Sequence, residues 1–343
     1  MALVKFSGVG VKAVAACVPK NVEKVSQLTN LFTEKEMENF VATTGIRERR
    51  IVPSESICAS DLCFVAAERL LKENNIDRKS IDMLLFMTQG FDYISPATSP
   101  VLQHRLGLPS STACMDLTLA CSGYVYALST AMSYCASANI NRVLVLVGDI
   151  SSRTVDRKDN SFWPLIGDAG TATLVEKGKE NFFFDLVTFG ESYKSILIPC
   201  SINGRNPVSP LGFDEKSIKA KLEGLDVFSF AISQVPKSVR RLLDYSEKNM
   251  DDVDKFLLHQ ANGYITKQIT KKLGTPREKV VENIDRFGNT SMASLPLMMA
   301  SELQEQSKKR QWLMSGFGAG LSIGTCYGNF ENCTISKLIE YEP

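Results

Sequence analysis

The chain has 343 residues and a formal net charge of +1 at pH 7, because 39 Lys and Arg residues nearly balance 38 Asp and Glu residues. So small a net charge provides no overall field for binding nucleic acid or an anionic membrane surface, and we expect neither partner. The length suits two core-forming units or one large α/β domain. No apolar run approaches the roughly 18 residues that cross a bilayer, so we predict no membrane span.

The cysteines favour reduced thiols over disulfides or a metal site. There are nine, an odd number, and no two have Cys-x-x-Cys spacing. Only two histidines are present, so we expect no zinc site. The N-terminal sequence Met-Ala-Leu-Val-Lys-Phe has neither the charged start nor the apolar centre of a signal peptide. These features predict a cytoplasmic protein.

Hydrophobic periodicity predicts alternating strands and helices through the first half of the chain. The predicted strands cover residues 3–18, 81–87, 113–120, 143–148 and 171–175, and the predicted helices cover 33–43, 56–75, 98–106 and 122–138. The uninterrupted β-branched run at 143–148 is typical of a central strand covered on both faces. We interpret the short basic run Arg47–Arg50 as a solvated turn.

The second half repeats this alternation. Residues 179–215 predict a strand hairpin followed by a long loop, and the elements that follow are helices at 224–248 (interrupted near Pro236), 262–273 and 291–307, with strands at 255–259, 280–284, 312–315 and 321–327. The pattern predicts an α/β protein whose mixed sheet is covered by helices on both faces. The repeated order also indicates an internal duplication, with a break between about residues 176 and 224.

Cys121 stands between a strand-like run and a helix rich in small residues. A thiol at a helix N-terminus experiences the partial positive charge of that end, which lowers the thiol pKa and favours the nucleophilic thiolate. The alternative is a packed structural thiol, because free Cys is among the most buried residue types.

Two polar residues of the second half occupy similar places. His259 ends the apolar run 256–258, and Asn289 lies between a strand and a helix. Ligands of α/β folds gather at the carboxyl ends of strands, so Cys121, His259 and Asn289 are candidates for one site. A structural His and an Asn that caps the following helix are the alternatives.

Four motifs occur in the order and spacing of β-ketoacyl-acyl-carrier-protein synthase III, and the chain resembles that family from about residue 8 to 330. They are Leu119-Ala-Cys-Ser-Gly123, Leu258-His-Gln-Ala-Asn262, Phe287-Gly-Asn-Thr-Ser291 and Gly316-Phe-Gly-Ala-Gly320, and Thr44–Arg50 and Ile166-Gly-Asp-Ala-Gly170 are similar to further landmarks. The resemblance implies a thiolase-like α/β fold with two similar halves, residues 1–178 and 179–343, in five α-β-α-β-α layers. It also implies a homodimeric acyltransferase of fatty acid biosynthesis.

The resemblance further implies a role for each site residue. Cys121 would carry an acyl group taken from a thioester, and His259 and Asn289 would donate hydrogen bonds to the enolate formed when malonyl-acyl carrier protein loses CO₂. The backbone N–H groups of Cys121 and Ala319 would form a second oxyanion site. Ala319 stands where the family usually has Gly, and its N–H remains a donor if φ is negative there. No cofactor is expected beyond acyl-CoA or carrier-protein thioesters.

The chain departs from the family pattern where thioesters enter. The Trp and Arg that usually clamp the adenine of CoA are replaced by Asn39 and Thr43, so the acyl donor is either a carrier protein or a CoA held differently. Tyr264 replaces an Arg that helps to dock the carrier protein. The basic side chains that follow on the same predicted helix, Lys267, Lys271 and Lys272, are our hypothesis for the docking site, with a solvated helix face as the alternative.

Other functions stay open at this point. The main alternative is an acyltransferase that moves the acyl group from Cys121 to a hydroxyl or amine, with His259 as general base. A non-catalytic scaffold is disfavoured, because such a protein would not need the intact set of Cys121, His259 and Asn289. A nucleotide-dependent oxidoreductase is disfavoured because Ala13 interrupts the glycine fingerprint that begins at Gly8. The resemblance also places the segment Gln89–Ser99 near the acyl pocket of a partner subunit, with the small Ser95 leaving a roomier pocket.

Overall fold

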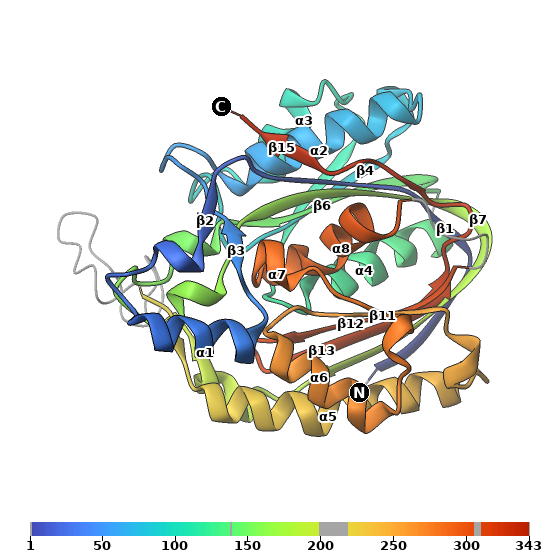
Figure 1. The fold of residues 1–343 in the computed structure, drawn as a ribbon. Helices are drawn as coiled ribbons and strands as arrows, with labels where there is room; N and C mark the ends of the chain where they lie inside the picture. The colour runs from blue at the N-terminus through green and yellow to red at the C-terminus, as the bar shows by residue number, and fades with distance from the viewer. Residues whose placement is uncertain (1, 138, 199–218, 305–309, 343) are drawn as a thin grey trace.

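The computed structural model describes residues 2–137, 139–198, 219–304 and 310–342 (Figure 1). The helices are α1 Glu34–Thr44, α2 Ala59–Glu73, α3 Thr98–Arg105, α4 Gly123–Ser137, α5 Gly224–Tyr245, α6 Gly263–Leu273, α7 Ile284–Phe287 and α8 Ser294–Glu302. The strands are β1 Ala2–Pro19, β2 Val22–Lys24, β3 Glu48–Arg50, β4 Met83–Met87, β5 Ala113–Leu117, β6 Arg142–Asp149, β7 Ala169–Thr188, β8 Ile196–Leu197, β9 Lys221–Leu222, β10 Lys255–Leu258, β11 Val280–Val281, β12 Gln311–Gly318, β13 Ser322–Asn329, β14 Thr334–Ile335 and β15 Ile339–Tyr341. Among these described helices, none has the length and apolarity that a membrane crossing requires.

Two sets of four strands have the same spatial order and the same directions. The first set runs β5-β4-β6-β7 and the second runs β11-β10-β12-β13. In each set the first three strands are parallel and the fourth is antiparallel to its neighbour. The two similar halves predicted from the sequence are therefore present as two copies of one topology.

The long strand β7 joins the two sets. Its first part pairs with β6 and its second part pairs with β13, while β1 lies antiparallel along both parts. The register between β1 and β7 shifts where Val9 faces the segment from Lys177 to Glu180. The predicted division after residue 178 falls in this irregular segment and stays a prediction, because β7 continues through it.

The elements stack in five layers (Figure 1). Helices α2 and α3 cover the outer face of the first set of strands, and α5 and α6 cover the outer face of the second. Helices α4 and α8 lie between the two sets, where apolar side chains from both sheets meet. The predicted five-layered α/β arrangement is confirmed.

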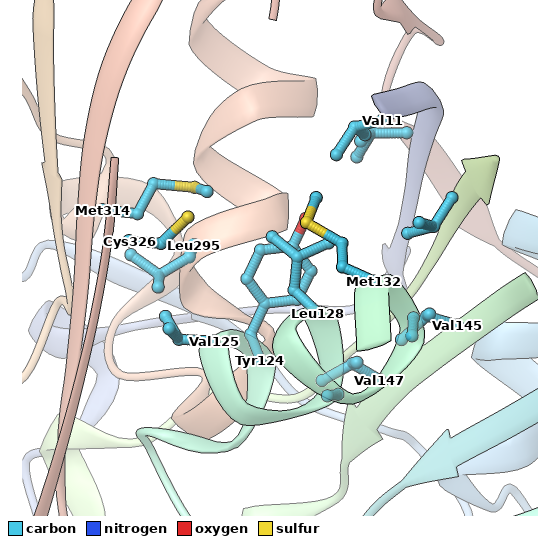
Figure 2. Packing of buried hydrophobic residues seen from close by; sticks show 14 of the residues in the cluster. Val11, Tyr124, Val125, Leu128, Met132, Val145, Val147, Leu295, Met314 and Cys326 are labelled. Carbon is cyan, nitrogen blue, oxygen red and sulfur yellow. The ribbon is translucent and has the colours of Figure 1, made fainter. Parts of the chain in front are cut away.

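The central layer holds the largest cluster of buried side chains. Figure 2 shows Tyr124, Leu128 and Met132 of α4 with β6 valines on one side and Met314 of β12 on the other. Each of these side chains is fully buried, and burying one large apolar side chain contributes roughly 1.5–3 kcal/mol. This packing holds α4, and with it the residues just before α4, at a fixed depth between the sheets.

Three local predictions differ from the structure. Arg49 is fully buried and belongs to β3, so the prediction of a solvated turn at residues 47–50 is wrong there. Helix α5 continues through Pro236 without the predicted interruption, because apolar side chains on both sides of Pro236, such as Phe230 and Val239, pack in one cluster with the strands. The strand predicted at 171–175 extends to Thr188, and the loop predicted up to residue 215 lies largely outside the described residues.

Candidate active site

Cys121 lies in the short connection between β5 and α4, two residues before the helix begins. Its Sγ is 3.8 Å from Oγ of Ser291. Strand β12 passes directly behind it: a Cβ added to Gly318 would lie 3.0 Å from Sγ, and one added to Gly316 would lie 2.7 Å from the Cys121 carbonyl oxygen. Glycine is therefore needed at positions 316 and 318, because a side chain at either position would displace Cys121.

Burial dominates the acidity of this thiol. It raises the pKa of Cys121 to about 11, and the hydrogen bond with Ser291 opposes the rise only in part. The prediction that the helix end would lower this pKa is wrong for the free protein. The Cys121 thiol is therefore protonated at neutral pH.

His259 follows β10, and its backbone N–H donates to the Ser315 carbonyl of β12 at 2.9 Å. The ring is buried, its Nδ1 lies 2.8 Å from Oγ of Ser294, and the Phe317 ring meets it edge to face. Burial lowers the pKa of His259 to about 3, so the imidazole is neutral at physiological pH. Because Nδ1 is engaged by Ser294, Nε2 is the nitrogen available to the cavity.

Asn289 lies between α7 and α8, and hydrogen bonds of its backbone fix its position. Its N–H donates to the Leu165 carbonyl at 2.7 Å, and its carbonyl accepts from the Gly167 N–H at 2.9 Å. The side-chain Oδ1 accepts from the Ser291 N–H at 2.9 Å, which leaves the Nδ2 amide hydrogens as the free groups. Ser291 adopts a φ of 51° in making this turn, a conformation that costs of order 1–3 kcal/mol outside glycine.

Arg49 supports the segment against which Asn289 lies. Its guanidinium donates to the Trp163 and Ile166 carbonyls and pairs with Glu23. Arg49 thus holds the backbone at residues 163–166, and the Leu165 carbonyl and Gly167 N–H of this region hydrogen-bond the backbone of Asn289. The Trp163 and Ile166 acceptors explain why Arg49 is buried within a basic run that looked like a surface turn.

Two backbone donors lie beside the thiol. Within the described residues the Ala319 N–H donates no backbone hydrogen bond, and the Cys121 N–H donates to the thiol sulfur of its own residue. Positive φ values outside glycine occur in the described part only at Asn75, Glu247 and Ser291, so Ala319 has the negative φ under which its N–H remains a donor.

The residues predicted to form the site line one cavity of about 170 Å³. Cys121, His259, Asn289 and Ala319 all line it, and the remaining wall is largely apolar. Asp149, at the carboxyl end of β6, also lines it, and burial together with the nearby Asp168 raises the pKa of Asp149 to about 7. Residues from both halves thus meet at one site, as predicted, although Asn289 follows helix α7 and not a strand.

The three candidate docking lysines lie outside this cavity. Lys267, Lys271 and Lys272 are exposed on α6. Lys267 and Lys271 line a separate groove of about 1030 Å³ together with Arg47 and Tyr264, and Lys272 does not line it. The first turn of α6 borders both spaces, since Asn262 and Ile265 line the cavity.

Sequence reasoning missed three polar residues of the site, Ser291, Ser294 and Asp149. Asp149 had a readable signal, because it directly follows a buried central strand. The two serines contact Cys121 and His259 across the fold, and no local pattern distinguishes them from helix-start serines. In the parts of the chain that are described, no three His, Cys, Asp or Glu side chains gather as metal ligands.

The five-layered fold with a cysteine before its central helix, facing a His and an Asn from the other half, defines a thiolase-like condensing enzyme. The family description "3-Oxoacyl-[acyl-carrier-protein (ACP)] synthase III" matches residues 115–191, and its C-terminal counterpart matches residues 243–329. A β-ketoacyl-[acyl-carrier-protein] synthase III of Streptococcus uberis is 36% identical over 86% of this chain and 91% of its own length, and one of Levilactobacillus brevis is 35% identical over 94% and 98%. The crystal structure of a 3-oxoacyl-(acyl-carrier protein) synthase from Burkholderia xenovorans is similar with a TM-score of 0.92, 34% identity and 99% coverage of both chains. The chain belongs to the β-ketoacyl-acyl-carrier-protein synthase III family.

Proposed function

We propose that the protein catalyses decarboxylative Claisen condensation of an acyl thioester with malonyl-acyl carrier protein, giving a β-ketoacyl thioester. The observation that carries this proposal is the fixed orientation of Asn289. Its Oδ1 is occupied by the Ser291 N–H, so the side chain presents hydrogen-bond donors to the cavity. Donors are what an enolate oxygen requires.

The first half-reaction loads the nucleophile. The Cys121 sulfur attacks the thioester carbonyl, and the N–H groups of Cys121 and Ala319 bind the tetrahedral oxyanion. Collapse expels the donor as its thiol, which takes up the proton that Cys121 loses. The product is an acyl-enzyme of similar bond energy to the starting thioester.

The second half-reaction forms the carbon–carbon bond. The malonyl carboxylate leaves as CO₂, and the electron pair left behind forms an enolate whose oxygen accepts hydrogen bonds from His259 Nε2 and Asn289 Nδ2. The carbanion attacks the acyl carbonyl, and the Cys121 thiolate departs and is reprotonated. This chemistry uses only thioesters and protein donors, so we propose no metal or cofactor.

The malonyl thioester would arrive on an acidic carrier protein that docks at Lys267, Lys271 and Lys272. Their exposure beside the cavity supports this, as does the groove in which Arg47 adds further positive charge. The donor of the acyl group is either a CoA or a carrier protein, because Asn39 and Thr43 do not provide the usual adenine clamp.

A homodimer is part of the proposal. The outer edge of β5 has no strand partner within the described chain, and the segment Gln89–Ser99 exposes Phe91, Tyr93 and Ile94 by 48%, 57% and 73%. Such a row of exposed large apolar side chains is typical of an interaction surface. We place the enzyme in the cytoplasm and in fatty acid biosynthesis, consistent with the eight described cysteines, which are all free thiols.

The alternative is acyl transfer from Cys121 to a hydroxyl or amine without condensation. It would require His259 Nε2 to accept a proton, and it leaves the Asn289 donor without a task. The experiment is to supply an acyl thioester with malonyl-acyl carrier protein and determine the product masses. A β-ketoacyl thioester supports condensation, whereas an acyl ester or amide with intact malonyl thioester supports transfer.

A further inference from the structure

We propose that Ser294 is a positioning residue that fixes the proton of His259 on Nε2. The inference rests on the proposed function, in which Nε2 donates to the enolate oxygen. Ser294 is the first residue of α8 and His259 follows β10, so the two side chains meet across the fold. Ser294 Oγ lies 2.8 Å from Nδ1, and each residue is only 1% exposed.

The proton positions follow from the partners of the hydroxyl. A buried O–H group that finds no acceptor is unfavourable. Within the described residues, the only hydrogen-bond partner of Ser294 Oγ is Nδ1 of His259. The hydroxyl therefore donates to Nδ1, which must then carry a lone pair. A neutral imidazole has a single N–H, and it is left on Nε2.

This tautomer separates the two candidate reactions. With its proton on Nε2, His259 donates to an oxygen in the cavity and cannot accept a proton from an incoming hydroxyl or amine. Ser294 thus selects the donor role that condensation needs over the general-base role that simple transfer needs. The edge of the Phe317 ring against His259 supplies no polar group that would compete for either nitrogen.

The direct test is a ¹⁵N spectrum of histidine-labelled protein at neutral pH. The chain has only two histidines, and His104→Gln removes the other, which is exposed at the end of α3. The resonances of the remaining ring report which nitrogen carries hydrogen. A proton on Nε2 is expected, and a proton on Nδ1 would overturn the inference.

Variants of Ser294 test its consequence. Ser294→Ala should lower kcat for malonyl decarboxylation about tenfold or more, with the KM for malonyl carrier protein and the rate of Cys121 acylation changed less than about twofold. Ser294→Thr keeps a hydroxyl and should recover most of the rate. Ser238→Ala, at another fully buried serine that bonds Asp185, controls for lost stability. An equal loss in both half-reactions, or no loss, contradicts a positioning role.

The outcomes separate this inference from the function on which it rests. CO₂ release by a protein whose His259 carries its proton on Nδ1 would contradict the inference alone. A proton on Nε2 without CO₂ release would contradict the proposed condensation alone. If Ser294→Ala does not fold, the ¹⁵N spectrum of the protein with native Ser294 still decides.

Discussion

Replacing Asn289 with Asp should stop decarboxylation while leaving self-acylation intact. The two side chains have the same shape, and one carboxylate oxygen can keep the 2.9 Å hydrogen bond from the Ser291 N–H. The change is therefore confined to the position of Nδ2, where two donor hydrogens become an anionic acceptor. Cys121 and the backbone N–H groups beside it are untouched.

The expected loss follows from the lost donor. Removing one preorganised donor to an oxyanion slows a reaction about 10²–10³-fold, or roughly 2.7–4 kcal/mol. A carboxylate facing the enolate adds charge repulsion in a buried cavity, so we expect Asn289→Asp to be slower than Asn289→Ala. The loss should appear in kcat for CO₂ release.

The assay measures the two half-reactions separately. Intact-protein mass follows acylation of Cys121, and rapid-quench measurement of CO₂ follows malonyl decarboxylation. Asn283→Asp is the matched control, because Asn283 is 1% exposed, bonds Ser301 and does not line the cavity. Decarboxylation by Asn289→Asp within about threefold of the unmodified rate would refute the donor role, and so would loss of acylation.

Three other changes test neighbouring parts of the account. Because burial holds the thiol pKa near 11, alkylation of Cys121 by iodoacetamide should accelerate about tenfold per pH unit from neutral pH to about pH 10, and a plateau near pH 7 would show a stabilised thiolate instead. Gly318→Ala should block acylation of Cys121 in a folded protein, since the new Cβ would lie 3.0 Å from the Cys121 Sγ. Gly190→Ala is the control, because its Cβ would have no atom within 4 Å and acylation should be unchanged. Equal acylation of the two variants would contradict the close approach of Gly318 to Cys121. Charge reversal of Lys267 and Lys271 together should raise the KM for malonyl carrier protein about tenfold or more and do less harm at high salt, and an unchanged KM would rule out docking there.

Much of the candidate site was predictable from the sequence because Cys121 and His259 follow strands. His259 directly follows a short apolar run, and Cys121 directly precedes a helix, so the topology of an α/β fold brings them together. The two halves were likewise readable, since each repeats the same order of strands and helices. The continuity of β7 was not, because a break was predicted after about residue 176, whereas pairing with β1 on both sides of this point extends the strand to Thr188.

The remaining errors have a common cause, which is burial that no local pattern reports. Arg49 looked like a surface residue, yet carbonyl acceptors from Trp163 and Ile166 make its burial possible. The position of Cys121 at the N-terminus of α4 suggested a thiol of low pKa, but desolvation raises that pKa instead. Ser294 carried no signal at all, because its role depends on a ring 35 residues away in the sequence.

The central claim is that one cavity first stores an acyl group and then joins it to a decarboxylated malonyl unit. It is tested most directly by isolating the protein acylated at Cys121 and mixing it with malonyl-acyl carrier protein in a single turnover. We expect one CO₂ for each acyl group lost from Cys121, together with the mass of the β-ketoacyl carrier protein. An acyl-enzyme that persists without CO₂ release, or that passes its acyl group to a hydroxyl or amine, would contradict the account.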